Sequence, residues 1–190
     1  MLWVYNKAHA RQLLVDSYDV TAAFIQVGQA RMIIASMYDA NSGGSTVERN
    51  LNLLRTLELV QQAVMQAKAE VGIETPVLIC TDFNRHDAVW TGVQPRAPRW
   101  NDGDMVINFA QTLGLVSLLE PGIITWEHQT QDLSSTIDVI WGSIEVQGQL
   151  QWCRLYEKDH GSDHRAIEIA LGAQITRTRE KPRLELNKAD

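Results

Sequence analysis

The sequence predicts a single domain of mixed α/β class, with more sheet than helix. Its 190 residues are a usual length for one domain. Hydrophobic residues make up 45% and charged residues 21%, which is typical of a globular chain rather than a disordered or fibrous one. Runs of β-forming residues alternate with two amphipathic helical patterns, and this alternation predicts the mixed class.

A β-hairpin is predicted in the first quarter of the chain. The segments 20–27 (VTAAFIQV) and 31–38 (RMIIASMY) are rich in β-formers, and the sequence between them, Gly28-Gln29-Ala30, is a turn signal. The segment 2–5 (LWVY) also has the composition of a strand. Because this strand begins at the second residue, we expect the chain to start in the middle of a fold.

Two helices are predicted after the hairpin. The first has a capping box at Ser45 and Glu48 and ends near Gly72. Its apolar residues recur at steps of three or four and form one stripe: Val47, Leu51, Leu54, Leu57, Val60, Val64, Ala67 and Val71. The second covers 104–113 and stops at Gly114. We expect both apolar stripes to face the core.

Three further strands are predicted, over 76–80, 135–141 and 165–171, with Asp138 in the middle of the second. After them, the segment 177–183 is basic, polar and interrupted by Pro182. We therefore expect one domain over 1–172 and a polar tail or linker over 173–190.

The composition limits the classes of function. Against 17 Lys and Arg stand 23 Asp and Glu, a net charge of −6, which argues against binding nucleic acid mainly by neutralising phosphates. It is compatible with carboxylates that hold a cation. The two cysteines, Cys80 and Cys153, are too few for a disulfide framework. No signal peptide or membrane span is visible, so we expect an intracellular protein that is neither secreted nor membrane-bound.

Polar residues follow the apolar strand at 77–80, where TDFN occupies 81–84. In an extended chain Asp82 and Asn84 would point to the same side. A carboxylate beside an amide oxygen suits a hard cation or a phosphate. An ordinary turn after a strand is the alternative interpretation of the same pattern.

Two more acidic positions are candidates. A carboxylate within a strand, as predicted for Asp138, is unfavourable unless it is paired or faces water. It could accept the N–H of an imidazole and fix its tautomer, or lie on an exposed edge strand. The segment 159–165 (DHGSDHR) places Asp163 and His164 before the last strand, and His164 is a candidate general base or phosphate ligand.

The order of these residues resembles the endonuclease/exonuclease/phosphatase superfamily, which has the DNase I-like fold. The matching pattern is Tyr38 at a strand end, a long helix, Asp-Phe-Asn at 82–84, Thr-Ile-Asp at 136–138 and Ser-Asp-His at 162–164. Within the superfamily, the segments DFNRHDAVW (82–90), SSTID (134–138) and DHGSDHR (159–165) are similar to the endonuclease domain of non-LTR retrotransposons abundant in fungal genomes.

The resemblance implies a two-sheet α/β sandwich with helices outside and the site at one end, between the sheets. It also implies hydrolysis of a phosphodiester in DNA with Mg²⁺ or Mn²⁺, and a parent polyprotein that contains a reverse transcriptase. On this basis we expect a nuclear protein. By the same resemblance, Asp82 orients or deprotonates the attacking water, Asn84 holds that water or a phosphate oxygen, and Asp163 and Asp82 lie at the metal.

The resemblance further implies that His164 contacts the scissile phosphate, that Asp138 holds the His164 ring, and that Tyr38 donates to a phosphate oxygen. For His86 and Trp90 the alternative is a packed loop beside the site. The substrate-binding residues implied are Asn84, His86, Trp90 and Ser162.

Two metal-site residues of the superfamily, an Asn after the first strand and a Glu in a Gln-Glu-Pro-like turn, have no counterpart in this sequence. We therefore expect a domain truncated at its N-terminus, with weakened metal affinity and with exposed sheet edges that favour self-association. The alternatives are a catalytically inactive remnant that acts at most by binding, or another phosphoesterase of the superfamily, such as an abasic-site nuclease or one acting on lipids or nucleotides.

Overall fold

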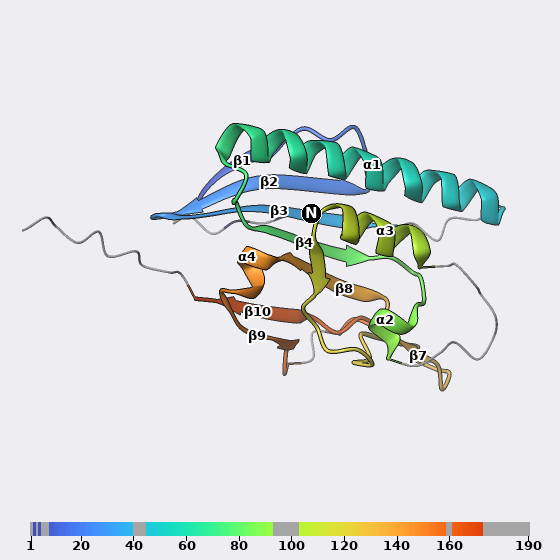
Figure 1. Ribbon diagram of the computed structural model, residues 1–190. Helices are drawn as coiled ribbons and strands as arrows, with labels where there is room; N and C mark the ends of the chain where they lie inside the picture. Colours follow the sequence, from blue (N-terminus) through green and yellow to red (C-terminus); the bar gives the residue numbers. More distant parts are fainter. Residues whose placement is uncertain are drawn as a thin grey trace, which may run out of the picture.

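The computed structural model describes residues 2, 4, 8–39, 45–92, 103–158 and 161–172. A six-stranded sheet lies between two layers (Figure 1). The helices α1 (Thr46–Val71) and α3 (Asp104–Thr112) cover one face of this sheet. The strands β9 (Leu150–Leu155) and β10 (Ile167–Leu171) form an antiparallel pair that packs on the other face. The predicted mixed α/β class is therefore confirmed.

The large sheet has the strand order β1-β2-β3-β4-β8-β5. Only β3 and β4 are parallel, because α1 crosses between them, and every other neighbouring pair is antiparallel. Its strands are β1 (His9–Leu13), β2 (Val20–Val27), β3 (Ala30–Tyr38), β4 (Val77–Asp82), β5 (Leu115–Ser117) and β8 (Asp138–Ser143). The remaining elements are α2 (Ala88–Thr91), β6 (Trp126–Glu127), β7 (Ser134–Ser135) and α4 (Ile144–Gln147).

Two hydrophobic cores hold these layers together. The larger lies between α1, α3 and the large sheet, and includes Val60 and Ile33, both fully buried. The smaller lies between the large sheet and β9–β10, where Leu78 and Ile140 pack against partly buried residues such as Ile169. Since β10 is half-exposed at every position, this second sheet covers its face of the large sheet less completely.

The predicted hairpin and both predicted helices are present. Gly28 and Gln29 form a two-residue turn between β2 and β3, with Gly28 at φ +60°, a conformation that favours glycine. At the start of α1, the Ser45 hydroxyl accepts from the Glu48 amide, and the Ser45 amide donates to the Glu48 carboxylate. This is the capping box that the sequence predicts.

The predicted buried stripe of α1 is wrong in its first half. Val47, Leu51 and Leu54 are 67%, 60% and 42% exposed. The buried residues are Leu53, Leu57, Val60, Val64 and Ala67, of which the last four belong to the predicted stripe. Leu53 and Leu54 both stand at helical spacing from Leu57, so periodicity alone could not choose between them, and the position of the helix on the sheet decides.

Two strand predictions need correction. The predicted strand 2–5 is not seen at Leu2 or Val4, and its other residues lie outside the described residues. The first described strand is β1, whose residues are mostly exposed; it is held by pairing with β2 rather than by apolar side chains. The predicted strand 135–141 is broken at 136–137, so Asp138 is the first residue of β8 and not a mid-strand residue.

Several short elements were not predicted, among them β1, β5, β9 and α2. The predicted tail over 173–190 lies outside the described residues. Within the part of the chain that is described, no helix is both long enough and apolar enough to cross a membrane.

Trp90 offers a test of the larger core. Its side chain is 1% exposed and meets Trp141 edge-to-face at 6.2 Å. We expect Trp90→Ala to lower the free energy of unfolding by roughly 3–5 kcal/mol, the range for removing a buried aromatic side chain. Chemical denaturation measures this.

Trp152→Ala is the matched control, because Trp152 lies on β9 with 37% of its surface exposed. We expect it to cost less than about 1 kcal/mol. Equal losses for the two variants would contradict the position of Trp90 in the core.

Candidate active site

Three of the predicted site residues lie side by side at one edge of the large sheet. Tyr38 ends β3, Asp82 ends β4 and Asp138 begins β8. The strand register pairs Tyr38 with Asp82, and Asp82 with Asp138. Because β8 runs antiparallel to β4, its first residue meets the last residue of β4, and the three side chains form a row.

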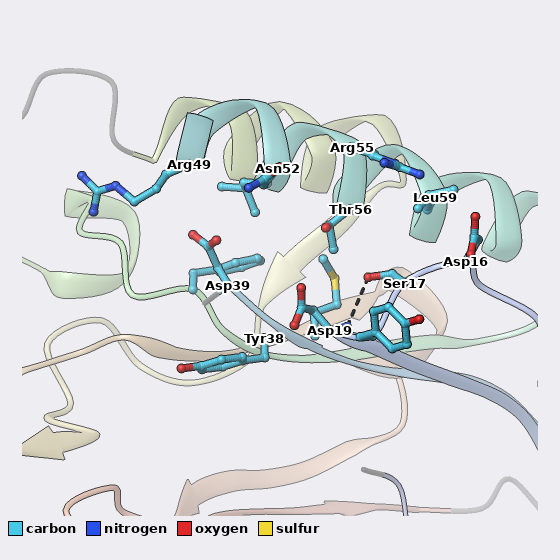
Figure 2. A pocket seen from close by; sticks show the side chains of 14 residues that line it. Asp16, Ser17, Asp19, Tyr38, Asp39, Arg49, Asn52, Arg55, Thr56 and Leu59 are labelled. Carbon is cyan, nitrogen blue, oxygen red and sulfur yellow. Dashed lines mark hydrogen bonds between the residues drawn. The ribbon is translucent and has the colours of Figure 1, made fainter. Parts of the chain in front are cut away.

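This row borders a cleft of about 410 Å³ between the large sheet and β10, whose lining includes Tyr38, Asp82, Asp138 and Arg165. A second cavity, of about 360 Å³, lies beneath α1 on the other side of Tyr38 (Figure 2). Tyr38 lines both and is 48% exposed. Its side chain is therefore accessible to a ligand bound in the cleft.

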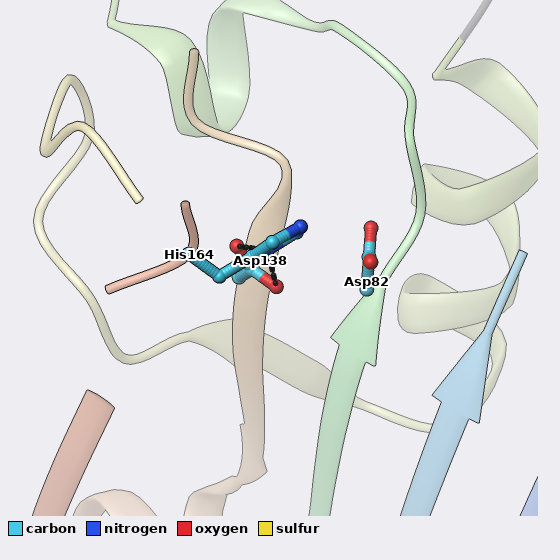
Figure 3. A group of neighbouring side chains, drawn as sticks. All are labelled: Asp82, Asp138 and His164. Atoms are coloured by element: carbon cyan, nitrogen blue, oxygen red, sulfur yellow. Dashed lines mark hydrogen bonds and ion pairs between the residues drawn. The ribbon is translucent and has the colours of Figure 1, made fainter. Parts of the chain in front are cut away.

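His164 joins the row from the loop before β10. Its ring Nδ1 lies 3.0 Å and 3.3 Å from the two carboxylate oxygens of Asp138 (Figure 3). One ligand atom each from Asp82, Asp138 and His164 lie within 4.8 Å of one another. Of the two alternatives for Asp138, contact with an imidazole or exposure on an edge strand, the structure has the first.

The electrostatics of this cluster differ from those of isolated side chains. Burial, and then the charge of Asp138, raise the pKa of Asp82 to about 6. Partial burial on its own lowers the pKa of His164, but the hydrogen bond and charge of Asp138, with the charges of Asp82 and Asp163, outweigh it and leave the pKa raised. The ring is therefore more readily protonated than an ordinary histidine, and Asp82 is a stronger base than an ordinary carboxylate.

Asp163 and Ser162 lie at the rim of the site, outside the cluster of Asp82, Asp138 and His164. The exposed Asp163 carboxylate accepts from the Trp126 indole N–H at 3.0 Å, and this bond lowers its pKa. The Ser162 hydroxyl accepts from the His164 amide at 3.1 Å and so shapes the turn that presents the ring. The metal-binding role predicted for Asp163 stays a prediction.

The prediction that Asp82 and Asn84 point to the same side of an extended chain is wrong. The strand ends at Asp82, and Asn84 has φ +50°, in the left-handed region that Asn tolerates better than most residues. Its amide N–H donates to the Asp82 carboxylate at 3.3 Å, and its side-chain NH₂ donates to the carbonyl of Asp39 at 3.0 Å. Asn84 therefore ties the Asp82 carboxylate to the end of β3.

His86 and Trp90 occupy different positions. His86 is half-buried, with Nδ1 3.0 Å from the Ser135 hydroxyl. Trp90 is buried in the core, and its indole N–H donates to the carbonyl of Arg85 at 3.1 Å. The substrate-binding role expected for Trp90 is wrong for this structure, because no face of the ring is open; the packed loop, the alternative interpretation, describes it.

One ion pair at the site was not predicted. The Arg85 guanidinium, 5% exposed, lies 2.9 Å from the Asp39 carboxylate and donates to the Asn50 side chain at 2.8 Å. This pair ties the loop after β4 to the end of β3, next to Tyr38. In the sequence, Asp39 directly follows Tyr38 and Arg85 directly follows Asp82-Phe-Asn. Each of these charged residues, taken alone, has the pattern of a surface position, so the pair was not predicted.

The family follows from comparison with known proteins. A model of the family described as "Endonuclease-reverse transcriptase" matches residues 32–168, and the chain belongs to this family. It is thus a member of the endonuclease/exonuclease/phosphatase superfamily, as the sequence motifs indicate. Comparison with curated protein sequences gives no match.

Solved structures of the superfamily share the fold. The endonuclease domain of TRAS1, a telomere-specific non-LTR retrotransposon, superposes with a TM-score of 0.65 at 16% identity, covering 90% of this chain and 71% of that one. The 3′-5′ exonuclease NExo from Neisseria meningitidis gives 0.62 at 17%, covering 87% and 70%. A variant of the 3′ phosphatase NExo from Neisseria, bound to product DNA hairpin, gives 0.61 at 18%, covering 88% and 71%. The predicted DNase I-like fold is therefore confirmed.

Replacing Asp82 with Asn is expected to stabilise the metal-free protein at neutral pH. The pKa of Asp82 is higher in the folded chain, at about 6, than its ordinary value of 3.8, so folding is opposed once the carboxyl ionises. The stabilisation by Asp82→Asn therefore appears as pH rises from about 4 and is complete above pH 6. Allowing for the partial exposure of the group, we expect about 1–2 kcal/mol.

Urea unfolding across this pH range, with a chelator present, measures the difference between the two proteins. Asp104→Asn, a carboxylate of α3 outside the site, is the control and should not reproduce the stabilisation. An Asp82→Asn variant that is equally or less stable than the unaltered protein at neutral pH would contradict the electrostatic description of the cluster.

Proposed function

We propose that this chain is a metal-dependent endonuclease domain of a retroelement, which hydrolyses a phosphodiester in target DNA and leaves a 3′-OH. The observation that carries the proposal is the single row of Tyr38, Asp82 and Asp138 at one sheet edge, with His164 bonded to Asp138. A base, a cationic donor and a hydroxyl donor gathered at one sheet edge suit the hydrolysis of a phosphodiester.

Each residue has a chemical role in this proposal. Asp82 is ionised at neutral pH and accepts a proton from the attacking water. His164 donates from its outer ring nitrogen to a phosphate oxygen, and Asp138 fixes the ring through Nδ1. Tyr38 donates its hydroxyl to another phosphate oxygen. The water oxygen bonds to phosphorus as the P–O3′ bond breaks, and the 3′ oxygen takes up a proton from solvent, which leaves a 5′-phosphate and a 3′-OH.

The residues present fit a divalent cation. Asp82 and Asp138 offer carboxylate oxygens, the ligands that Mg²⁺ and Mn²⁺ prefer, close to the His164 ring. When bound, such an ion would polarise the phosphate and stabilise the leaving 3′ oxygen. A cation would also offset the repulsion between Asp82 and Asp138 that raises the pKa of Asp82.

The retroelement assignment rests on the family and on the likeness to the TRAS1 domain. A parent polyprotein with a reverse transcriptase, a nuclear location, and a 3′-OH that primes DNA synthesis belong to the same proposal. So does self-association through exposed sheet edges: among the described strands β10 pairs only with β9, and its other edge is where a second copy would pair.

Nicking of supercoiled plasmid tests the proposal. With Mg²⁺ or Mn²⁺ we expect the chain to produce open-circular DNA whose nicks a DNA polymerase extends directly, as a 3′-OH requires. Asp82→Asn and His164→Ala should each lower the rate by about 100-fold or more, because each removes a proton acceptor or donor at the reacting phosphate.

His9→Ala, in the exposed strand β1, is the matched control for His164→Ala and should nick like the unaltered chain. Asp163→Ala separately tests the metal-binding role through the Mn²⁺ concentration required for half-maximal rate. Absence of nicking by the unaltered chain with either ion would overturn the proposal, and equal nicking by all variants would overturn the site.

A further inference from the structure

A short segment outside the predicted site touches both partners of the Asp138–His164 pair. This segment, Thr125 to Glu127, includes β6 and lies between β7 and the loop that carries His164. No motif in the sequence marks it, and none of its residues belongs to the row of Tyr38, Asp82 and Asp138.

On one side, the segment holds the start of β8. Thr125 is 0% exposed, and its hydroxyl oxygen accepts from the backbone N–H groups of Ile137 and Asp138, each at 3.1 Å. The break in the strand at 136–137 takes these two amides out of a regular ladder, and a buried amide needs a partner. Thr125 supplies that partner at the residue whose carboxylate receives His164.

On the other side, the segment holds the His164 loop. The Arg165 amide donates to the carbonyl of Thr125 at 2.7 Å, and the Glu127 amide donates to the carbonyl of Asp163 at 2.9 Å. The backbones of Trp126 and His164 form a β-bridge, and the Trp126 indole N–H donates to the Asp163 carboxylate. The residues before and after His164 are thus both bonded to this segment.

We propose that Thr125 is a positioning residue that sets the register between Asp138 and the His164 ring. Its side chain fixes the backbone of Asp138, while its carbonyl fixes Arg165, next to His164. This inference rests on the proposed function only for its effect on rate, because the Asp138–His164 contact itself is open to direct observation. Thr125 touches neither the proposed substrate nor the reacting atoms.

Val replaces Thr with the same branched shape but without the oxygen acceptor. In Thr125→Val we expect the start of β8 to shift so that the 3.0 Å contact between Asp138 and His164 lengthens. A displacement of about 1 Å at a catalytic group can cost about 100-fold in rate. We therefore expect kcat of nicking to fall by about 10- to 100-fold with KM within about twofold, and Thr125→Ser, which keeps the oxygen, to restore it.

Thr136→Val is the matched control. Thr136 is 4% exposed, and its hydroxyl donates to the carbonyl of Ile123 at 2.7 Å, so it links the same two chain segments without touching Asp138 or the His164 loop. It removes one buried hydroxyl bond, whereas Thr125→Val removes the acceptor of two, at Ile137 and Asp138. We expect Thr136→Val to nick at the rate of the unaltered chain. Equal loss of rate in Thr125→Val and Thr136→Val would show that the loss of any buried hydroxyl bond is enough, and would overturn the positioning role.

A spectroscopic measurement separates this inference from the proposed function. In the metal-free protein, the His164 Nδ1 proton bonded to Asp138 should give a low-field proton resonance that Asp138→Asn abolishes. We expect Thr125→Val to shift or lose this resonance, while Thr125→Ser and Thr136→Val retain it. An unchanged resonance in Thr125→Val overturns the positioning role even if the chain nicks DNA; a resonance lost only in that variant supports the role even if the chain does not.

Discussion

The contact between the Asp138 carboxylate and the His164 ring is the constraint on which the rest of the site depends. The two residues are 26 positions apart and belong to different layers, the large sheet and the loop that enters β10. Their 3.0 Å separation therefore requires β9–β10 to sit at one defined place on the large sheet. The smaller core, between Leu78, Ile140 and residues of β10, provides that placement. Apolar packing thus fixes how the two layers lie, and the buried hydrogen bonds of the Thr125 to Glu127 segment act on the pair within that arrangement.

The same arrangement gathers negative charge at one end of the sheet. Asp82 and Asp138 are register neighbours, and burial together with their repulsion raises the pKa of Asp82 to about 6. The ionised form of Asp82 therefore lowers the stability of the fold, and a carboxyl group with such a raised pKa is typical of functional sites. The Asp39–Arg85 pair and the bonds of Asn84 tie the neighbouring strand ends together where this charge is concentrated. Part of the net charge of −6 is therefore local to the site.

The fold alone does not choose between the activities of the superfamily. The TRAS1 endonuclease domain gives a TM-score of 0.65 with this chain, and two structures of NExo, described as a 3′-5′ exonuclease and as a 3′ phosphatase, give 0.62 and 0.61, too close to favour one chemistry. What they share with this chain is the fold. Substrate choice then depends on the loops around the site, such as the one carrying Ser162 and His164.

The sequence by itself determined the mixed class, the hairpin, both predicted helices and the ends of the strands that carry Tyr38 and Asp82, because these follow from local propensity and periodicity. That Asp138 begins its strand instead of lying in the middle of it came only from the structure. Only the tertiary structure decided which stripe of α1 is buried, that Asn84 turns back toward Asp39, and that Trp90 packs in the core. It also revealed the Thr125 to Glu127 segment, whose hydrogen bonds join residues that no local pattern relates. Secondary structure depends on residues that are close in the sequence. The position of one sheet on another depends on the packing of the whole core, which no short stretch of sequence determines.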